Sequence, residues 1–332
     1  MTTFATDVLI VGAGLAGLMA ARTLVEAGKK VIVLDKGRSV GGRMATRRVG
    51  EGLADHGAQF FTVRDAEFQA YVDRWLADGV IFEWSRGWSD GSLTSERDGH
   101  PRYAVRGGMN ALPKLLAATI DARVNTEINA ARTFNEGWQV DDVNGNHVTA
   151  RALILTPPVP QSLEVLRKGG VLLNNEQHKA LESIDYEPCV TGILVVDGMV
   201  SLPAPGAIQR PGAQLTWIAD NKRKGLSESD TILTVQASPS YSRSLWDLRD
   251  EEIVSALRID LMPFIGEDGV IREAQIKRWK YSQPVTRYPE RCLQAVGTPP
   301  LIFCGDAFGG PRVEGAVLSG LAAGRAMVGL IP

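Results

Sequence analysis

Three glycines near the start of the chain have the spacing of a pyrophosphate-binding turn. Gly12, Gly14 and Gly17 follow the apolar run 8–11, which predicts a strand, and a helix-forming stretch continues to Leu24. Gly12 permits the sharp bend, Gly14 lets a ligand approach the backbone, and Gly17 allows the helix to pack tightly on the strand. The N–H groups at the helix start then face an anion. The pattern predicts a site for the pyrophosphate of a dinucleotide.

An acidic residue follows at the position that reads the ribose of such a ligand. A second apolar run, 31–34, ends in Asp35, whose carboxylate would accept from the ribose 2′-hydroxyl. Strand, turn, helix, strand and acid all lie within the first 35 residues, which favours a ligand site over a glycine turn that binds nothing. NAD and FAD fit this unit equally well.

The loop after Asp35 carries basic side chains beside the predicted pyrophosphate. Lys36, Arg38 and Arg43 alternate there with glycines. Because a guanidinium binds two phosphate oxygens at once, we expect Arg43 to contact phosphate, with Arg38 a weaker candidate. A solvated basic loop is the alternative interpretation.

Two further segments carry groups suited to the same ligand. Residues 54–62 form a second glycine-centred turn that ends in Phe60 and Phe61, although alone it would pass for an ordinary buried turn. Near the C-terminus, the apolar strand 301–304 ends in Gly305-Asp306, and residues 313–316 open a helix that must also be a core helix.

The remaining segments predict an α/β chain of two domains. The predicted elements are a helix over 65–79, an irregular and mobile stretch over 87–102, a helix from 107–110, a β-meander over 122–155, a domain crossing at the prolines of 156–158, and an aromatic-rich second domain over 160–290 with an amphipathic helix near 250–262. No tandem repeat or low-complexity tract is found.

Composition excludes several classes of protein. The chain has 332 residues, 44% of them apolar, and a net charge of −2, so we expect no nucleic-acid partner and no polybasic membrane segment. The uncharged stretch 8–21 is shorter than the ~18 residues of a membrane span, and no basic region precedes it. Three cysteines and four scattered histidines predict a reducing cytoplasm, no disulfide framework and no metal site.

The chain downstream of the first unit distinguishes between the two cofactors. A nicotinamide dehydrogenase would complete its parallel sheet within the next hundred residues, whereas here a meander intervenes and the strand ending in Gly305-Asp306 comes last. A flavoprotein with a separate NADPH domain would carry a second strand-GxGxxG-helix unit, which this sequence lacks.

Five segments together resemble the flavin-containing amine oxidase superfamily, and within it the renalase-like bacterial proteins. They read VLIVGAGLAGLMAAR, LDKGRSVGGRMATRR, DHGAQFFT, GGMNALPKLLA and IFCGDAFGGPRVEGAVLSGLAAGRA, and RWKYSQP at 278–284 matches more loosely. The resemblance implies a Rossmann-type FAD-binding domain of the GR2/amine-oxidase kind with an inserted mixed-sheet substrate domain. The expected boundaries are 1–62, 103–160 and 290–332 for the FAD-binding domain, and 63–102 and 161–289 for the substrate domain.

The resemblance also implies roles for individual residues. The phosphates and ribose would be held near the first turn, the flavin ring near Gln59 and Phe60, and the ribitol or pyrophosphate near Asp306. The full predicted set is Gly12, Gly14, Leu15, Ala16, Gly17, Asp35, Lys36, Gly42, Arg43, Met44, Gln59, Phe60, Gly305, Asp306, Glu314, Gly315 and Ala316.

Three of those residues, Glu314, Gly315 and Ala316, would face the pyrimidine edge of the flavin. The partial positive charge of a helix N-terminus there stabilises the anionic reduced ring. Two departures from the superfamily matter. The SGGCY motif that tethers flavin is absent, so noncovalent FAD is expected, and residues 310–313 lack the aromatic that would build an amine cage.

The leading hypothesis is an FAD oxidase of renalase type that takes hydride from 2- or 6-dihydro isomers of NAD(P)H and reduces O₂ to H₂O₂. A dihydropyridine needs no general base, so the site requires a flat apolar slot that holds the donor carbon about 3 to 3.5 Å from flavin N5. The candidate walls are Phe61, Trp217, Trp279 and Tyr281, and the candidate polar contacts to the carboxamide or ribose are Gln283 and Arg287. Taken singly, each of these side chains is more often a core or surface residue than a ligand contact.

Two rival hypotheses remain open. An amine oxidase or desaturase would need a lysine near N5, for which Lys280 is the candidate. A flavin- or nucleotide-binding sensor would bind without turnover. We expect a small-molecule substrate and O₂ as partners, and a monomer or weak homodimer.

Overall fold

The first sheet of the computed structural model, which describes residues 4–92 and 98–331, has a parallel centre. Its main path runs β16 (Leu293–Gln294), β17 (Leu301–Phe303), β10 (His147–Leu155), β1 (Thr6–Val11), β2 (Val31–Leu34) and β7 (Asp121–Arg123), and β8 (Ile128–Phe134) and β9 (Gly137–Asp142) extend it from β10. β1 pairs in parallel with β2 and β10. Burial on both faces explains the uninterrupted apolar runs of its central strands.

Two helices cover one face of this sheet and pack directly on each other. They are α1 (Leu15–Glu26) and α8 (Arg312–Leu330). A Cβ at Gly320 would overlap the Ala16 carbonyl oxygen, and one at Gly324 would meet Thr23. α8 is long and apolar enough to span a membrane by length and composition, but 56% of its apolar window is buried inside the protein. Close packing on α1 therefore accounts for its small apolar residues.

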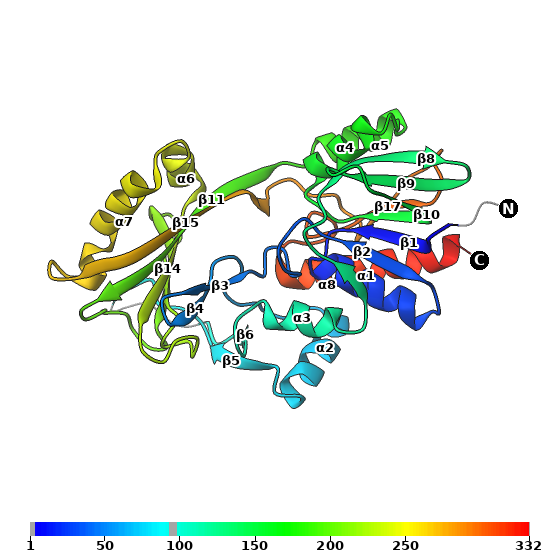
Figure 1. The fold of residues 1–332 in the computed structure, drawn as a ribbon. Coiled ribbons are helices and arrows are strands. Elements are labelled where there is room, and N and C mark those ends of the chain that lie inside the picture. Colours follow the sequence, from blue (N-terminus) through cyan, green and yellow to red (C-terminus); the bar gives the residue numbers. More distant parts are fainter. Residues whose placement is uncertain (1–3, 93–97, 332) are drawn as a thin grey trace.

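A second, antiparallel sheet lies apart from the first. Its order is β12 (Ala207–Gln209), β13 (Leu215–Asp220), β14 (Thr231–Ala237), β11 (Tyr186–Asp197) and β15 (Val270–Pro284), and α6 (Pro239–Leu245) and α7 (Asp250–Ile265) pack beside it. Figure 1 shows this sheet with α6 and α7 at the left and the first sheet at the right. The long strands β11 and β15 extend from the second sheet toward the first (Figure 1).

Smaller elements lie between the sheets, below them and, in the case of α4 and α5, above the first sheet (Figure 1). They are the hairpin of β3 (Thr46–Val49) and β4 (Gly52–Asp55), the hairpin of β5 (Ile81–Ser85) and β6 (Arg102–Val105), and the helices α2 (Ala66–Ala77), α3 (Ala111–Ala117), α4 (Val159–Lys168) and α5 (Asn175–Glu182). Val49 and Ala54 pack against Ile193 and Ile232 of the second sheet. The β3–β4 hairpin thus joins the glycine-rich N-terminal region to the second sheet.

The packing differs from the expected division of the chain at two places. The α2 side chains Phe68, Val72 and Trp75 lie in the same core as α1 and α8, so α2 packs with the first domain, not the second. Leu166 of α4 and Leu181 of α5 pack with the first sheet as well, and the chain enters the second sheet at β11 instead of at the prolines of 156–158. Of the irregular segment 87–102, residues 93–97 lie outside the described residues.

Candidate active site

The glycine turn lies at the carboxyl end of β1, where α1 begins. Gly12 has φ +99°, and its N–H donates to the Leu34 carbonyl at 2.7 Å. A Cβ at Gly17 would overlap the Gly12 carbonyl oxygen, whereas a Cβ at Gly14 would meet nothing within 4 Å. Gly12 and Gly17 are therefore required by the fold itself, and Gly14 faces open space.

Gly14 is also the N-cap of α1 and lacks a side-chain cap, which leaves the first N–H groups of the helix for a ligand. Leu15 and Ala16 form the start of this helix.

Asp35 lies at the end of β2, next to the turn. Its carboxylate accepts from the N–H of Ala13 and from that of Gly37, both at 2.6 Å. A carboxylate has about four acceptor sites, so two stay available to a ribose. That contact stays a prediction, and Lys36 and Arg38 are exposed in the following loop.

Arg43 and Asp306 form a two-point ion pair across the site. Nη1 and Nη2 of Arg43 each lie 2.7 Å from one carboxylate oxygen of Asp306, and Nη1 also approaches the carbonyls of Tyr281 and Ser282 at 3.4 Å. The sequence predicts separate contacts of the two side chains with the ligand, and the structure shows that they bind each other. Gly42 lies beside Gly14, since a Cβ at Gly42 would be 3.5 Å from the Gly14 Cα. The pair and the two glycines therefore border the same space.

Contacts with neighbouring segments of the protein hold the start of α8 in place. A Cβ at Gly315 would overlap the Gly310 carbonyl oxygen, and the Gly305 N–H donates to Ser319 Oγ at 2.8 Å. The Glu314 carboxylate accepts from the N–H groups of Arg64 and Asp65, at 2.7 and 2.8 Å. The Glu314 side chain therefore fixes the start of α2, which leaves the backbone of 314–316 as the part that can face a flavin.

A fully buried ion pair joins the β3–β4 hairpin to the second sheet behind Gln59. Lys224 Nζ donates to Asp55 Oδ2 at 2.7 Å and to the Gln59 carbonyl at 2.6 Å, and both charged side chains have no exposed surface. Asp55 also accepts from Thr46 Oγ1 at 2.5 Å and from the Met109 N–H at 2.8 Å. Burial lowers the pKa of Lys224, and the Asp55 charge opposes that shift. Asp55 therefore stabilises the buried ammonium.

Sequence reasoning missed Lys224 because the run Asp220 to Lys224 reads as a solvated polar turn. The lysine singled out from the sequence, Lys280, is exposed, and its ammonium lies 5.4 Å above the Tyr281 ring. The signal that could have found Lys224 is that this run is bounded by the buried strands β13 and β14.

Two buried acceptors near the predicted flavin position lack a partner among the described residues. Gln59 Nε2 donates to the carbonyls of Asp55 and Gly57, at 2.7 and 3.2 Å, and leaves Oε1 unpaired. Asn110 Nδ2 donates to the Val40 carbonyl at 3.0 Å and leaves Oδ1 unpaired. Since buried polar atoms are nearly always paired, these oxygens fit a ligand that carries donors, such as the N3–H of the flavin ring and the ribitol hydroxyls of FAD. Met44 is buried in the adjoining core.

An aromatic cluster adjoins Phe60 on the side of the second sheet. Trp84, Trp88 and Trp217 pack edge to face, with ring centroids 4.7 to 6.0 Å apart, and Phe60 lies 5.2 Å from Trp88 and 5.3 Å from Trp217. The three indole N–H groups are buried and find no acceptor among the described residues. Lys224 Nζ lies 4.5 Å above the Trp84 ring. The sequence predicted Trp217 here but not Trp84 or Trp88.

Phe61, the neighbouring wall candidate, is misassigned by the sequence reading. Its side chain is 3% exposed and packs on Phe68 and Tyr103 in the first core, with centroids 5.8 and 5.7 Å away. Phe60 and Phe61 follow each other in an extended segment, so their side chains point to opposite sides. Phe61 is therefore a core residue.

Trp279 lies on β15 against the segment before Gln59. Its ring stacks on His56, with centroids 5.5 Å apart and planes 22° from parallel, and Nε1 donates to the His56 carbonyl at 2.9 Å. Burial is the main cause that lowers the pKa of His56 to about 4, and the charges of Arg47 and Lys277 add to it. His56 is therefore neutral at neutral pH. Tyr281 instead packs edge to face on Tyr186, while Gln283 and Arg287 are exposed.

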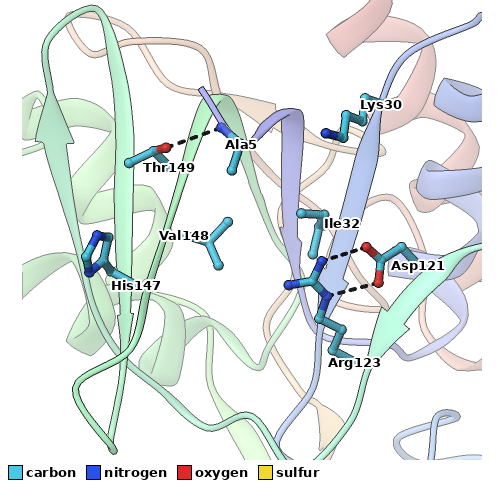
Figure 2. Close-up of a pocket in the computed structure, with 8 residues that line it drawn as sticks. All are labelled: Ala5, Lys30, Ile32, Asp121, Arg123, His147, Val148 and Thr149. Atoms are coloured by element: carbon cyan, nitrogen blue, oxygen red, sulfur yellow. Dashed lines mark hydrogen bonds and ion pairs between the residues drawn. The ribbon is translucent and has the colours of Figure 1, made fainter. Parts of the chain in front are cut away.

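A separate hollow of about 540 Å³ lies at the amino ends of β1, β2 and β7. Figure 2 shows its lining, which includes Lys30, His147 and the Asp121–Arg123 ion pair. This end of the sheet is opposite the glycine turn and Asp35, so the hollow is not part of the candidate site. Over residues 4–92 and 98–331, no group of three or more His, Cys, Asp or Glu residues is arranged to hold a metal ion.

Comparison with known proteins identifies the family. The model of flavin-containing amine oxidoreductases matches residues 87–328, and that of an NAD(P)-binding Rossmann-like domain matches residues 10–75. Renalase of Mus musculus is 25% identical over 338 residues, covering 95% of this chain and 96% of the mouse protein. Putrescine oxidase of Kocuria rosea is 46% identical over 72 residues, which are 22% of this chain and 15% of that protein.

Likeness to solved structures extends along the whole fold. A structure of putrescine oxidase bound to putrescine superposes with a TM-score of 0.71 at 16% identity and covers 98% of this chain and 99% of its own. The expected combination of a Rossmann-type domain and an inserted mixed-sheet domain is confirmed by this match and by both family models. The chain therefore belongs to the flavin-containing amine oxidoreductase family, and it is a flavin-dependent oxidoreductase related to renalase.

Proposed function

We propose that the protein is an FAD-dependent oxidase of renalase type, which oxidises 2- or 6-dihydro isomers of NAD(P)H to NAD(P)⁺ and reduces O₂ to H₂O₂. FAD, when bound, would supply the hydride acceptor and the route for two electrons to O₂, and one proton from solvent would balance the reaction. The proposed setting is a reducing cytoplasm, with the protein a monomer or weak homodimer.

Noncovalent binding of FAD is part of this proposal. The adenosine half would lie at Gly14 and Asp35, and the ring between the backbone of 314–316 and Gln59. The unpaired oxygens of Gln59 and Asn110 would accept from the ring and the ribitol. Cys304 is fully buried and burial raises the pKa of its thiol, which disfavours the thiolate that a covalent tether would need.

The observation that carries the proposed reaction is the buried aromatic cluster beside Phe60, whose three indole N–H groups have no acceptor among the described residues. The side chains around Phe60 are indoles, and the one buried lysine there is held by Asp55 and the Gln59 carbonyl. A dihydropyridine loses hydride to become an aromatic ring and requires no base, so the protein has only to position it and exclude water. Trp217, Trp84 and Trp88 would supply the apolar wall, and their N–H groups would donate to the carboxamide oxygen.

Amine oxidation is the second candidate. It is favoured by the family and by the local match to a putrescine oxidase. The aromatic cluster presents N–H donors instead of acceptors, however, so it offers no hydrogen-bond partner to a cationic amine.

An anaerobic substrate panel tests these readings. The purified protein, reconstituted with FAD, is mixed with 2-dihydroNAD, 6-dihydroNAD, ordinary NADH or a set of polyamines, and bleaching of the flavin band is followed. We expect fast bleaching by one or both dihydro isomers and recovery of the band with H₂O₂ when air is admitted. Bleaching by amines alone would refute the proposal, and no bleaching at all would favour a flavin sensor.

A further inference from the structure

The side chains on one face of β15 face the segment 36–56, and we call this face the strip. Alternate residues of a strand share a face, so Gln275, Lys277 and Trp279 point the same way. Three contacts show which residues of the segment 36–56 this face lies against. Gln275 Oε1 accepts from Arg47 at 3.1 Å, Trp279 stacks on His56, and the Tyr281 carbonyl faces Arg43. The strip therefore runs from the Arg43–Asp306 pair outward along the β3–β4 hairpin.

Two cations at this strip, Lys277 on β15 and Arg47 on the facing strand β3, lack a carboxylate partner among the described residues. Arg47 is exposed and Lys277 half-buried, and neither lies within 4.0 Å of a carboxylate oxygen among the described residues. Lys277 Nζ lies 5.1 Å above the Trp279 ring. Burial lowers the pKa of Lys277, and the charges of Arg47 and Lys36 lower it further. Like charges held together without a counter-charge are unfavourable, and an anion bound between them would relieve that cost.

A buried, unpaired nitrogen lies beside the two cations. His56 is 6% exposed, and its Nδ1 finds no partner among the described residues. Arg47 and Lys277 are both close enough to lower the pKa of His56, so the three side chains occupy one neighbourhood. Two cations, an unpaired imidazole nitrogen and an aromatic face suit a phosphate group attached to a nucleoside.

The strip is distinct from the predicted pyrophosphate position of FAD. That position lies at Gly14, Gly42 and the Arg43–Asp306 pair, which meets β15 at Tyr281. Lys277 is four residues further along the strand, or roughly 13 Å at about 3.3 Å per residue. A phosphate at the predicted FAD position would therefore be too far from Lys277 to pair with it.

We propose that Arg47, Lys277 and the stacked pair of His56 and Trp279 bind the pyrophosphate of the dinucleotide substrate, while its nicotinamide lies against the tryptophan wall. This assignment rests on the proposed oxidation of dihydronicotinamide nucleotides. It makes the strip the part of the site that distinguishes a dinucleotide from a free dihydropyridine.

The experiment compares two hydride donors in the FAD-loaded protein. One is 2-dihydroNAD, and the other is 1-methyl-1,2-dihydronicotinamide, which has the same ring and no phosphate. Arg47→Gln, Lys277→Gln and the double variant are assayed beside Arg48→Gln, a matched control that removes the next charge along β3. We expect the double variant to raise the half-saturating concentration of 2-dihydroNAD about tenfold or more. The value for the methyl compound and the values for Arg48→Gln should stay within about twofold of wild type.

Binding without turnover gives a second readout. Calorimetric titration of the holoenzyme with ADP should show binding that weakens about tenfold in the double variant. Equal losses for both donors, or loss of FAD from the variant, would overturn the assignment, because the cations would then serve the fold or the cofactor. If neither donor bleaches the flavin of the wild type, the proposed function fails, and the ADP titration still decides whether the strip binds phosphate.

Discussion

The two ends of the candidate site are formed by different kinds of contact. At the adenosine end, the turn of Gly12 to Gly17 and the acid Asp35 come from 24 consecutive residues, and the contacts are made largely by backbone. At the reacting end, Asp55, Gln59, Trp217 and Lys224 come from segments up to 169 residues apart, and side chains make the contacts. The first end depends on sterics, and the second depends on buried polar pairing.

This difference predicts how each end fails. At the adenosine end, the stability lost on substitution should depend on how much room each position has for a Cβ. At the reacting end, the stability lost should depend on whether the substitution leaves a buried charge or donor without its partner.

The largest expected effect is at the buried ion pair. Lys224→Met removes the cation and leaves the Asp55 carboxylate buried, which should lower the free energy of unfolding by about 3 to 5 kcal/mol. The double variant Lys224→Met/Asp55→Asn should recover part of this loss, because no charge stays buried. Urea unfolding followed by tryptophan fluorescence measures all variants.

Lys222→Met is the matched control for this pair. Its ammonium is exposed and donates to the Ser229 carbonyl, so a change below about 1 kcal/mol is expected. A loss in Lys224→Met as small as that of the control would show that the reacting end does not depend on buried charge.

The glycine turn should give the next largest effect, with a contrast inside one motif. Gly17→Ala would drive a Cβ into the Gly12 carbonyl oxygen and should cost about 3 kcal/mol of unfolding free energy. Gly14→Ala meets nothing within 4 Å, so it should cost less than about 1 kcal/mol while it weakens FAD binding, because the methyl group fills the ligand's side of the turn. Thermal melts and flavin content measured on the same preparations separate the two effects. Equal melting temperatures for Gly17→Ala and Gly14→Ala would contradict the expected contrast.

The same contrast explains how much the sequence could predict. Gly12, Gly14, Gly17 and Asp35 follow a fixed spacing whose geometry is local, so the first strands, α1 and the turn are where the sequence predicts them. The meander turns at 135–137 and 144–146 and the C-terminal strand and helix were predicted for the same reason.

The parts that sequence reasoning missed depend on contacts between distant segments. Lys224 lies in a polar run that resembles a surface turn, and its burial arises when β3 and β4 pack on the second sheet. Trp84 lies near the end of β5, and Trp88 lies in the segment 87–102, which composition predicts to be irregular. Phe60 and Phe61 have the same chemistry in sequence, and the strand pairing of Phe61 with Tyr103 determines which of them reaches the core.

A pH-dependent effect is expected at His56. Its pKa is about 4 in the folded protein against 6.5 for an ordinary histidine, so between these values the unfolded chain binds more protons. Stability contributed by neutral His56 is therefore complete above pH 6.5 and is lost as the pH falls toward 4, by up to about 3 kcal/mol. Urea unfolding at pH 4.5, 5.5 and 7.5 should show a steeper loss for wild type than for His56→Gln, and parallel curves would show that the imidazole is not shielded.

The smallest effect is expected at Trp217, and it addresses the reaction itself. Trp217→Phe keeps an aromatic wall and removes one unpaired indole N–H, so it should raise the half-saturating concentration of 2-dihydroNAD about fivefold, the value of roughly one hydrogen bond. Trp75→Phe, which alters a buried indole in the first core, is the control and should affect stability but not saturation. If Trp217→Phe saturates as wild type does, the indole N–H has no role in holding the carboxamide. The reacting end would then resemble the adenosine end in depending on shape alone.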